Sequence, residues 1–322
     1  TETSILPKEE KSRIDSLKNR YQRHVFTKAR NYDVSFQPDY VVTQFDNAFL
    51  NPMYQRFTGG PFFPNPGFNT FIKLGTTDVL EDYRVTGGVR FGGNMDNEFI
   101  VLLEDDKKRL DKAYVYNRMV SAVQSQDFLV KQVSNIFTYR LKIPLTLTQR
   151  FTVSPSLRID QDITLSSGPV SLQTPNNMNY WGRVKVDYVY DNSRMRGLNL
   201  YHGTRLKLFA EGFYQFESET PSMFVFGADI RNYTKIHKQI IWANRFAWSS
   251  SIGDQRLLYY LGGVDNWLAP RFNNNMQISN VQQYAYQTVA TNLRGFRQNI
   301  RNGNSFAVLN SEIRWPIFQY FI

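Results

Sequence analysis

The feature that most constrains the fold is an alternation of polar and apolar side chains, which recurs in segment after segment from residue 32 onward. Over residues 204–217, one face of an extended strand would be charged and the other apolar. The first face holds Arg205, Lys207, Glu211 and Gln215, and the second holds Leu206, Leu208, Ala210, Tyr214 and Phe216. Because successive side chains of a strand point to opposite faces, the pattern predicts strands with one wet and one apolar face.

Twelve such strands are predicted, at 32–44, 67–75, 83–92, 97–104, 112–124, 130–144, 149–162, 179–191, 204–217, 222–232, 237–249 and 304–318. Charged residues recur too often for the run of about eighteen apolar residues that a transmembrane helix needs. A closed barrel is the other structure that crosses a bilayer, and its strands alternate lipid-facing and lumen-facing residues. A soluble sandwich also alternates, but it seldom carries long charged side chains on strand after strand. We therefore predict an all-β, antiparallel transmembrane β-barrel.

Connection lengths support this prediction, because outer-membrane barrels have short periplasmic turns and longer external loops. If residue 30 is periplasmic, the long connections 45–66, 163–178 and 250–303 all face outward. Most periplasmic connections are then short, and 192–203 is an exception. The longest loop, 250–303, lies between the eleventh and twelfth predicted strands.

The remaining composition narrows the function classes. The charge of +10 arises from basic residues scattered along the strands, which does not favour a nucleic-acid partner. The chain has no cysteine and only three histidines, far apart, so we expect no enzyme activity, metal or cofactor. Residues 1–30 are charged with a narrow apolar stripe, and residues 1–7 do not resemble a signal peptide, so we expect a helical connector before a barrel at 31–322.

Near the end of the long loop comes a distinctive motif, followed by a polar and apolar strand. The motif residues are Leu293, Arg294, Gly295, Phe296, Gly303 and Asn304, and the strand contains Leu309-Asn310-Ser311-Glu312-Ile313-Arg314-Trp315-Pro316. This segment resembles the lid loop and following strand of the bacterial surface antigen superfamily. Members of that family include the central barrels of the outer-membrane protein assembly machine and the translocators of two-partner secretion.

The resemblance implies a sixteen-stranded barrel in the outer membrane of a Gram-negative bacterium, with the motif loop folded into the lumen between strands eleven and twelve. About twelve of the sixteen strands would lie in this chain, so we expect a further C-terminal piece. The N-terminal connector would be periplasmic, and a repeat module or β-propeller would precede it. The implied partners are outer-membrane lipid and other outer-membrane or periplasmic proteins, as in a multi-protein complex.

Two shorter segments are also similar to the family. Tyr190-Asp191-Asn192-Ser193-Arg194 with Gly203-Thr204-Arg205 resembles its turn before strand nine, although the expected proline is missing. Leu261-Gly262-Gly263 resembles the glycine pair that precedes the family's motif. Here about thirty residues, including Asn273-Asn274-Asn275, separate the glycine pair from the motif, so we expect an enlarged loop.

Each motif residue has a physical role that it could play. Gly295 would allow a tight turn with Phe296 packed beside it. The guanidinium of Arg294 suits a carboxylate, and Glu312 is the candidate, on one face with Arg314. The family's main partners would lie on later strands, and Arg294 could also simply staple the loop in place. Pro38, in the first strand, lacks a backbone donor and would favour a weak seam there.

Three functions remain open from the sequence. The first is assembly, insertion or translocation of proteins at the outer membrane. The second is a porin-like channel narrowed by residues 250–303, and the third is a structural anchor for a periplasmic or surface complex. A closed twelve-stranded barrel is an alternative to the sixteen-stranded one, since twelve is an allowed number.

Overall fold

The structure is a computed structural model in which two compact units, Thr1–Ser35 and Phe36–Ile322, can be distinguished. It describes residues 32–46, 54–57, 69–91, 97–124, 129–166, 173, 175–197, 199–216, 219, 222–264, 271–279 and 281–316. The helical connector expected at 1–30 lies outside the described residues. All described strands belong to the second unit, which is all-β.

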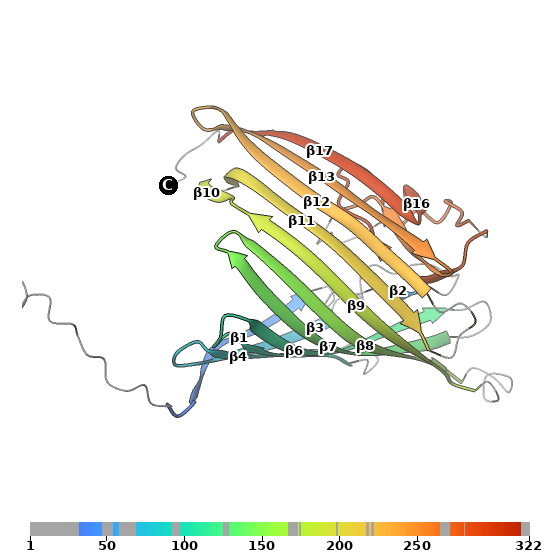
Figure 1. Ribbon diagram of the computed structural model, residues 1–322. Helices are drawn as coiled ribbons and strands as arrows, with labels where there is room; N and C mark the ends of the chain where they lie inside the picture. Colours follow the sequence, from blue (N-terminus) through green and yellow to red (C-terminus); the bar gives the residue numbers. More distant parts are fainter. Residues whose placement is uncertain are drawn as a thin grey trace, which may run out of the picture. The chain divides into compact units, whose positions relative to one another are not determined.

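A thirteen-stranded antiparallel sheet forms the wall of this unit (Figure 1). Twelve strands follow one another in the order β1-β3-β4-β5-β6-β7-β8-β9-β11-β12-β13-β17. Their bounds are β1 Phe36–Asp46, β3 Asn69–Asp78, β4 Tyr83–Phe91, β5 Asn97–Asp105, β6 Asp111–Gln124, β7 Leu129–Thr146, β8 Gln149–Thr164, β9 Asn177–Asp191, β11 Leu200–Gln215, β12 Ser222–His237, β13 Ile240–Gly253 and β17 Ser305–Arg314. The twelve predicted strands correspond one to one with these twelve.

The thirteenth strand accounts for the length of the connection 192–203, which was the exception among the short connections. Strand β10 (Arg194–Gly197) pairs with the start of β11, so the hairpin between β9 and β11 carries a short extension. Asn199 sits at the tip of this extension with a φ of 59°. Among the described residues, there is no apolar helix long enough to span a membrane.

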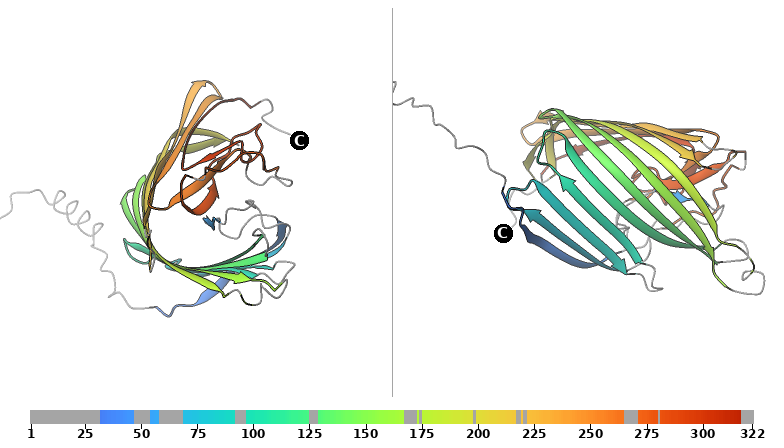
Figure 2. Two further views of the ribbon diagram at one scale, coloured as in Figure 1. Left: turned by 90° about the vertical axis from the view of Figure 1, so that its right-hand side faces the viewer. Right: turned by 60° about the horizontal axis from the view of Figure 1, so that its bottom comes forward.

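The sheet curves strongly, but its two ends do not meet (Figure 2). Within the part of the chain that the structure describes, β1 pairs only with β3, and β17 pairs only with β13. A barrel requires its first and last strands to be hydrogen-bonded to each other. The closed twelve-stranded barrel, one of the alternatives from the sequence, is therefore not what these strands form.

A second sheet of four short strands lies against the concave side of the large one. Its order is β16-β14-β15-β2, and we call it the plug. The bounds are β2 Gln55–Arg56, β14 Arg256–Leu261, β15 Tyr284–Val289 and β16 Arg301–Gly303. Strands β14 and β15 are parallel, whereas the other two pairings are antiparallel.

The plug corrects one expectation from the sequence. Residues 250–303 were expected to form a loop with little strand structure, but β13 continues to Gly253 and three plug strands follow. The fourth strand, β2, comes from another of the long connections, 45–66. Two loops that are far apart in sequence therefore build one small sheet.

Apolar packing joins the plug to the large sheet. One cluster of buried residues combines β9, β11 and β12 with β14 and β15, and consists of Trp181, Phe213, Met223, Val225, Leu257, Tyr259, Ala285 and Tyr286. On its other face, the plug buries Leu258 and Tyr260 beneath Phe57, Phe272 and Ile278. The plug is therefore covered on both faces.

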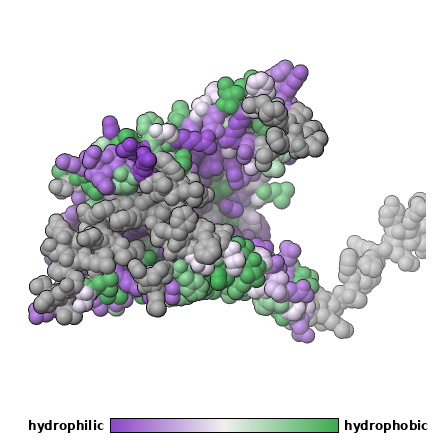
Figure 3. All heavy atoms as spheres, turned by 180° about the vertical axis from the view of Figure 1, so that it is seen from behind, coloured by the Kyte–Doolittle hydropathy of each residue, from purple (hydrophilic) through white to green (hydrophobic). Residues whose placement is uncertain are grey.

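The large sheet buries its polar face and exposes its apolar face, which is the reverse of the arrangement in a water-soluble protein. Buried polar side chains gather on its concave side, among them Arg158, Asp160, Asp187 and Glu211. The exposed side chains of the same strands are large and apolar, for example Tyr114, Phe137, Leu157, Val184, Leu208, Tyr214, Phe224, Ile230, Trp242, Phe246, Leu309 and Ile313. Viewed from the side where β1 and β17 do not meet, hydrophilic residues lie in the hollow between the two ends (Figure 3). Exposed apolar surface of this extent is typical of a protein that contacts lipid or another protein.

Candidate functional site

A buried ion pair on β8 holds the plug to the wall. Arg158 Nε lies 2.8 Å from Asp160 Oδ1, and the two side chains are only 5% and 3% exposed. The hydroxyl of Tyr286, from the plug, donates to Asp160 Oδ2 at 2.8 Å. The Arg158 guanidinium also lies 4.3 Å from the centroid of the Tyr286 ring, a favourable cation–π arrangement. Burial raises the pKa of the Tyr286 hydroxyl, so this group stays protonated and remains a donor.

The segment before β2 is tied to the same region of the wall. Arg158 Nη1 donates to the carbonyl oxygen of Tyr54 at 2.7 Å. The Tyr54 hydroxyl donates to Glu211 Oε1 at 3.2 Å, and Glu211 is also held by Arg183 and Lys185 at 2.7 Å each. Polar residues of the concave face thus bind both loops that contribute to the plug.

The glycine pair and the Arg-Gly-Phe motif lie side by side, although about thirty residues separate them in sequence. Gly263 and Leu293 form an isolated β-bridge, in which the Leu293 nitrogen donates to the Gly263 oxygen at 2.9 Å. The Gly263 nitrogen donates to the Phe296 oxygen at 3.0 Å. The glycine pair and the Arg-Gly-Phe motif are therefore in direct contact, although the inserted residues lie between them in sequence.

Close approach of the backbone explains why glycine is needed at 262. Its φ is +120°, and a Cβ there would lie 2.1 Å from the Arg297 oxygen. Gly263 is similar, with a φ of +77° and a Cβ position 2.5 Å from Gln298 Cγ. Only a residue without a side chain fits such conformations at such distances.

The Asn-rich insertion packs along the residues that follow the motif. The Asn273 nitrogen donates to the Gln298 oxygen at 2.9 Å, and the Gln298 nitrogen donates to the Arg271 oxygen at 3.0 Å. Buried Asn299 donates its side-chain amide to the Asn273 oxygen at 2.7 Å. The insertion is thus an integral part of the folded loop.

The remaining motif residues have less contact than the sequence suggested. Gly295 has a φ of +85°, but a Cβ there would meet no atom within 4 Å, so conformation and not space favours glycine. Phe296 remains half exposed. Gly303 pairs with Tyr259 of β14, and Asn304 exchanges hydrogen bonds with the Ser251 backbone at 2.8 and 3.0 Å.

Arg294 faces the residue that was its candidate partner. Its Nη1 lies 3.7 Å from Glu312 Oε1 on β17, and Glu312 also accepts from Arg314 at 3.1 Å. The Arg294 side chain is 81% exposed, so the pair contributes at most about 1 kcal/mol to stability. The buried contacts around Asp160 hold the plug far more strongly, which disfavours a role for Arg294 as its staple.

Pro38 lies on the edge strand β1, opposite Thr76 of β3, and the register shifts between Pro38 and Tyr40. This is a position where the missing donor of proline is tolerated.

The shorter segment at 190–205 that resembles the family's turn is held by hydrogen bonds and an ion pair. The Thr204 nitrogen donates to Asn192 Oδ1 at 2.7 Å, and Arg205 pairs with Asp191 at 2.8 Å.

Among the described residues, no three histidine, aspartate or glutamate side chains gather as metal ligands would. Comparison of the sequence with protein-family models and with curated proteins gave no match. The arrangement of plug, motif and wall is therefore the basis for inferring function.

Proposed function

We propose that the chain is an integral outer-membrane β-barrel protein that assembles, inserts or translocates polypeptides. One observation carries the proposal: the Arg294 loop folds against the glycine pair and reaches Glu312 on β17, beside a plug on the concave side. The resemblance to the surface antigen superfamily implies the same placement of the motif loop. The apolar convex face and the polar concave face support a barrel wall between lipid and a wet lumen.

The lipid-facing surface can be tested at Leu208, which lies on β11 between the inward-facing pair Lys207 and Phe209 and is 43% exposed. We expect Leu208→Arg to lower the free energy of unfolding in lipid vesicles by about 2–4 kcal/mol, because a charge in the bilayer interior is poorly solvated. Denaturant unfolding of the protein in vesicles measures this.

Leu147→Arg is the matched control, since Leu147 lies in a turn and its side chain is fully exposed. This change should have little effect. Equal and small effects at both positions would contradict a lipid contact for β11.

The plug favours protein handling over the two rival functions. A porin-like channel needs an open path, whereas here a covered sheet with a buried ion-pair anchor lies in the hollow. A structural anchor needs a stable wall, but it does not need an exposed arginine presented by a tight, glycine-dependent loop. The channel and the anchor each predict an outcome for replacement of Arg294 that differs from the outcome expected for protein handling.

We expect Arg294→Ala in the intact protein to lower the delivery of other proteins to the outer membrane or cell surface while the barrel itself remains folded. The reason is that Arg294 is exposed and adds little to stability, so its loss should affect activity more than folding. Quantitative proteomics of outer membranes from cells with the variant measures delivery.

Arg301→Ala serves as the control, because Arg301 is also exposed and lies in plug strand β16, and its side chain donates only to the neighbouring Ile300 oxygen among the contacts described. A change in conductance alone in Arg294→Ala would favour the pore. Unchanged delivery with unchanged conductance would favour the anchor.

A further inference from the structure

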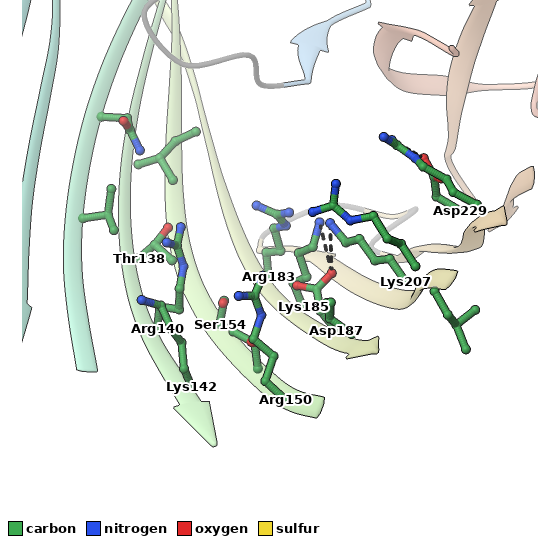
Figure 4. A pocket seen from close by; sticks show the side chains of 18 residues that line it. Thr138, Arg140, Lys142, Arg150, Ser154, Arg183, Lys185, Asp187, Lys207 and Asp229 are labelled. Atoms are coloured by element: carbon green, nitrogen blue, oxygen red, sulfur yellow. Dashed lines mark hydrogen bonds and ion pairs between the residues drawn. The ribbon is translucent and has the colours of Figure 1, made fainter. Parts of the chain in front are cut away.

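A polar cavity of about 720 Å³ lies on the concave side of the large sheet, toward the ends of the strands joined by short turns. Its wall comes from β6, β7, β8, β9, β11 and β12, whose inward side chains extend into one space (Figure 4). Small-molecule sites commonly enclose about 300–1,000 Å³. The cavity is therefore large enough for a compact solute.

The charges around this cavity are strongly unequal. Two acidic residues, Asp187 and Asp229, line it together with eight basic ones. The basic residues are Arg140, Lys142, Arg150, Arg183, Lys185, Arg205, Lys207 and Arg231. Several of these charges, such as Arg183 and Lys185, are largely buried and so are less screened by water and salt than surface charges, and such an excess attracts anions.

Carboxylates next to the cavity do not remove this excess, because several of them are shared between two cations. Asp187 lies 3.9 Å from Lys185 and 3.5 Å from Lys207. Asp229 lies 2.8 Å from Arg231 and 2.7 Å from Arg245.

The same sharing occurs just outside the lining. Glu104 lies 3.9 Å from Arg84 and 3.3 Å from Lys142. Glu211 holds Arg183 and Lys185, as described above. Because Lys185 is shared by Asp187 and Glu211, these four carboxylates face seven cations and leave about three positive charges in excess.

Two of the guanidinium groups have no partner at all within the described part of the chain. The side chains of Arg140 on β7 and Arg150 on β8 take part in no hydrogen bond or ion pair there. They lie on neighbouring strands. Lys142 of β7 is paired with Thr152 of β8, and each arginine lies two residues before one member of this pair. Arg140 is half-buried and Arg150 is exposed, so both can be reached from the cavity.

We propose that this cavity binds a compact polyanion bearing phosphate groups, with Arg140 and Arg150 as its principal ligands. A guanidinium offers five donors in a planar fork that matches phosphate oxygens. Several phosphate charges in one small molecule would balance the excess of the lining, which a single carboxylate would not. The site is distinct from the Arg294 loop and does not depend on the proposed role in protein handling.

Isothermal titration calorimetry of the intact protein with tripolyphosphate as the probe tests this site. We expect binding by the unaltered protein that weakens as salt is raised, because salt screens the attraction. The double variant Arg140→Gln/Arg150→Gln should bind about tenfold to a hundredfold more weakly, since each lost charge-assisted hydrogen bond is substantial. Arg140→Lys/Arg150→Lys should fall between the two.

The control is Lys108→Gln/Arg109→Gln, which removes the same charge from an exposed turn outside the cavity lining. It should bind as the unaltered protein does. No binding of tripolyphosphate, or equal weakening in the control, would overturn the proposal. Tighter binding of a hexaglutamate peptide than of tripolyphosphate would also overturn it, in favour of an acidic polypeptide segment.

Discussion

Asp160→Ala is expected to lower the free energy of unfolding by about 3–5 kcal/mol, because it leaves the buried Arg158 guanidinium without its carboxylate. The same change removes the acceptor of Tyr286 in the plug and of Ser134 on β7, at 2.8 and 2.5 Å. The plug should therefore loosen before the wall unfolds. Denaturant unfolding gives the loss of stability, and limited proteolysis of the plug segments shows where it occurs.

The control for this prediction is Asp33→Ala, which removes an exposed aspartate. It should change stability by less than about 0.5 kcal/mol. If Asp160→Ala were as mild as Asp33→Ala, or if the plug stayed protected from protease, the ion pair on β8 would not be its anchor.

Gly262→Ala is expected to destabilise the protein by about 3 kcal/mol, combining an unfavourable backbone conformation with a steric clash. The φ of +120° disfavours alanine, and its Cβ would lie 2.1 Å from the Arg297 oxygen. Since Arg297 follows the Arg-Gly-Phe motif directly, the motif loop would have to move away from the glycine pair. Protease cleavage between residues 291 and 304, together with an unfolding curve, measures both effects.

Substitutions at two other glycines distinguish the cost of the backbone conformation from the cost of the steric clash. Gly295→Ala keeps an unfavourable φ of +85° without any clash and should destabilise by about 1 kcal/mol. Gly87→Ala, in β4, meets no atom within 4 Å and has no positive φ, so it should be nearly neutral. If Gly262→Ala lowered the free energy of unfolding by no more than Gly295→Ala, the backbone near Arg297 would be able to move away at little cost.

Predicting the wall from sequence succeeded because each strand has two unlike faces. Lys207 and Leu208 are neighbours in sequence, yet one lines a cavity and the other is exposed on the apolar side. That contrast is visible as an alternation with a period of two. The same reasoning could not establish closure, since pairing between β1 and β17 depends on the curvature of the whole sheet.

The plug could not be predicted in the same way. Leu257, Leu258, Tyr259 and Tyr260 are all buried, because β14 is covered on both faces and so shows no alternation. Its short apolar run followed by two glycines was the available signal of a buried strand. Strand β2 has only two residues, too few for any pattern.

The candidate site was predictable in part. The residue types of Arg294 and Glu312 indicated that they could pair, and they lie 3.7 Å apart. The high exposure of Arg294 was not apparent, because it depends on where the loop sits relative to β17. Nor could the sequence show that Arg140 and Arg150 lack carboxylate partners, since that depends on the register of neighbouring strands.

The pairing of β2 with β15 imposes an order on folding. Arg56 lies opposite Tyr286 in the plug, and its oxygen accepts from Gln287, 231 residues later in the chain. Most neighbouring strands of the wall are instead joined by a single short connection, so they can zip together as successive hairpins. Contacts so distant in sequence carry a large loop-closure entropy and form late. We therefore expect the plug to close after most of the wall has formed, so that an incomplete wall would surround an empty hollow.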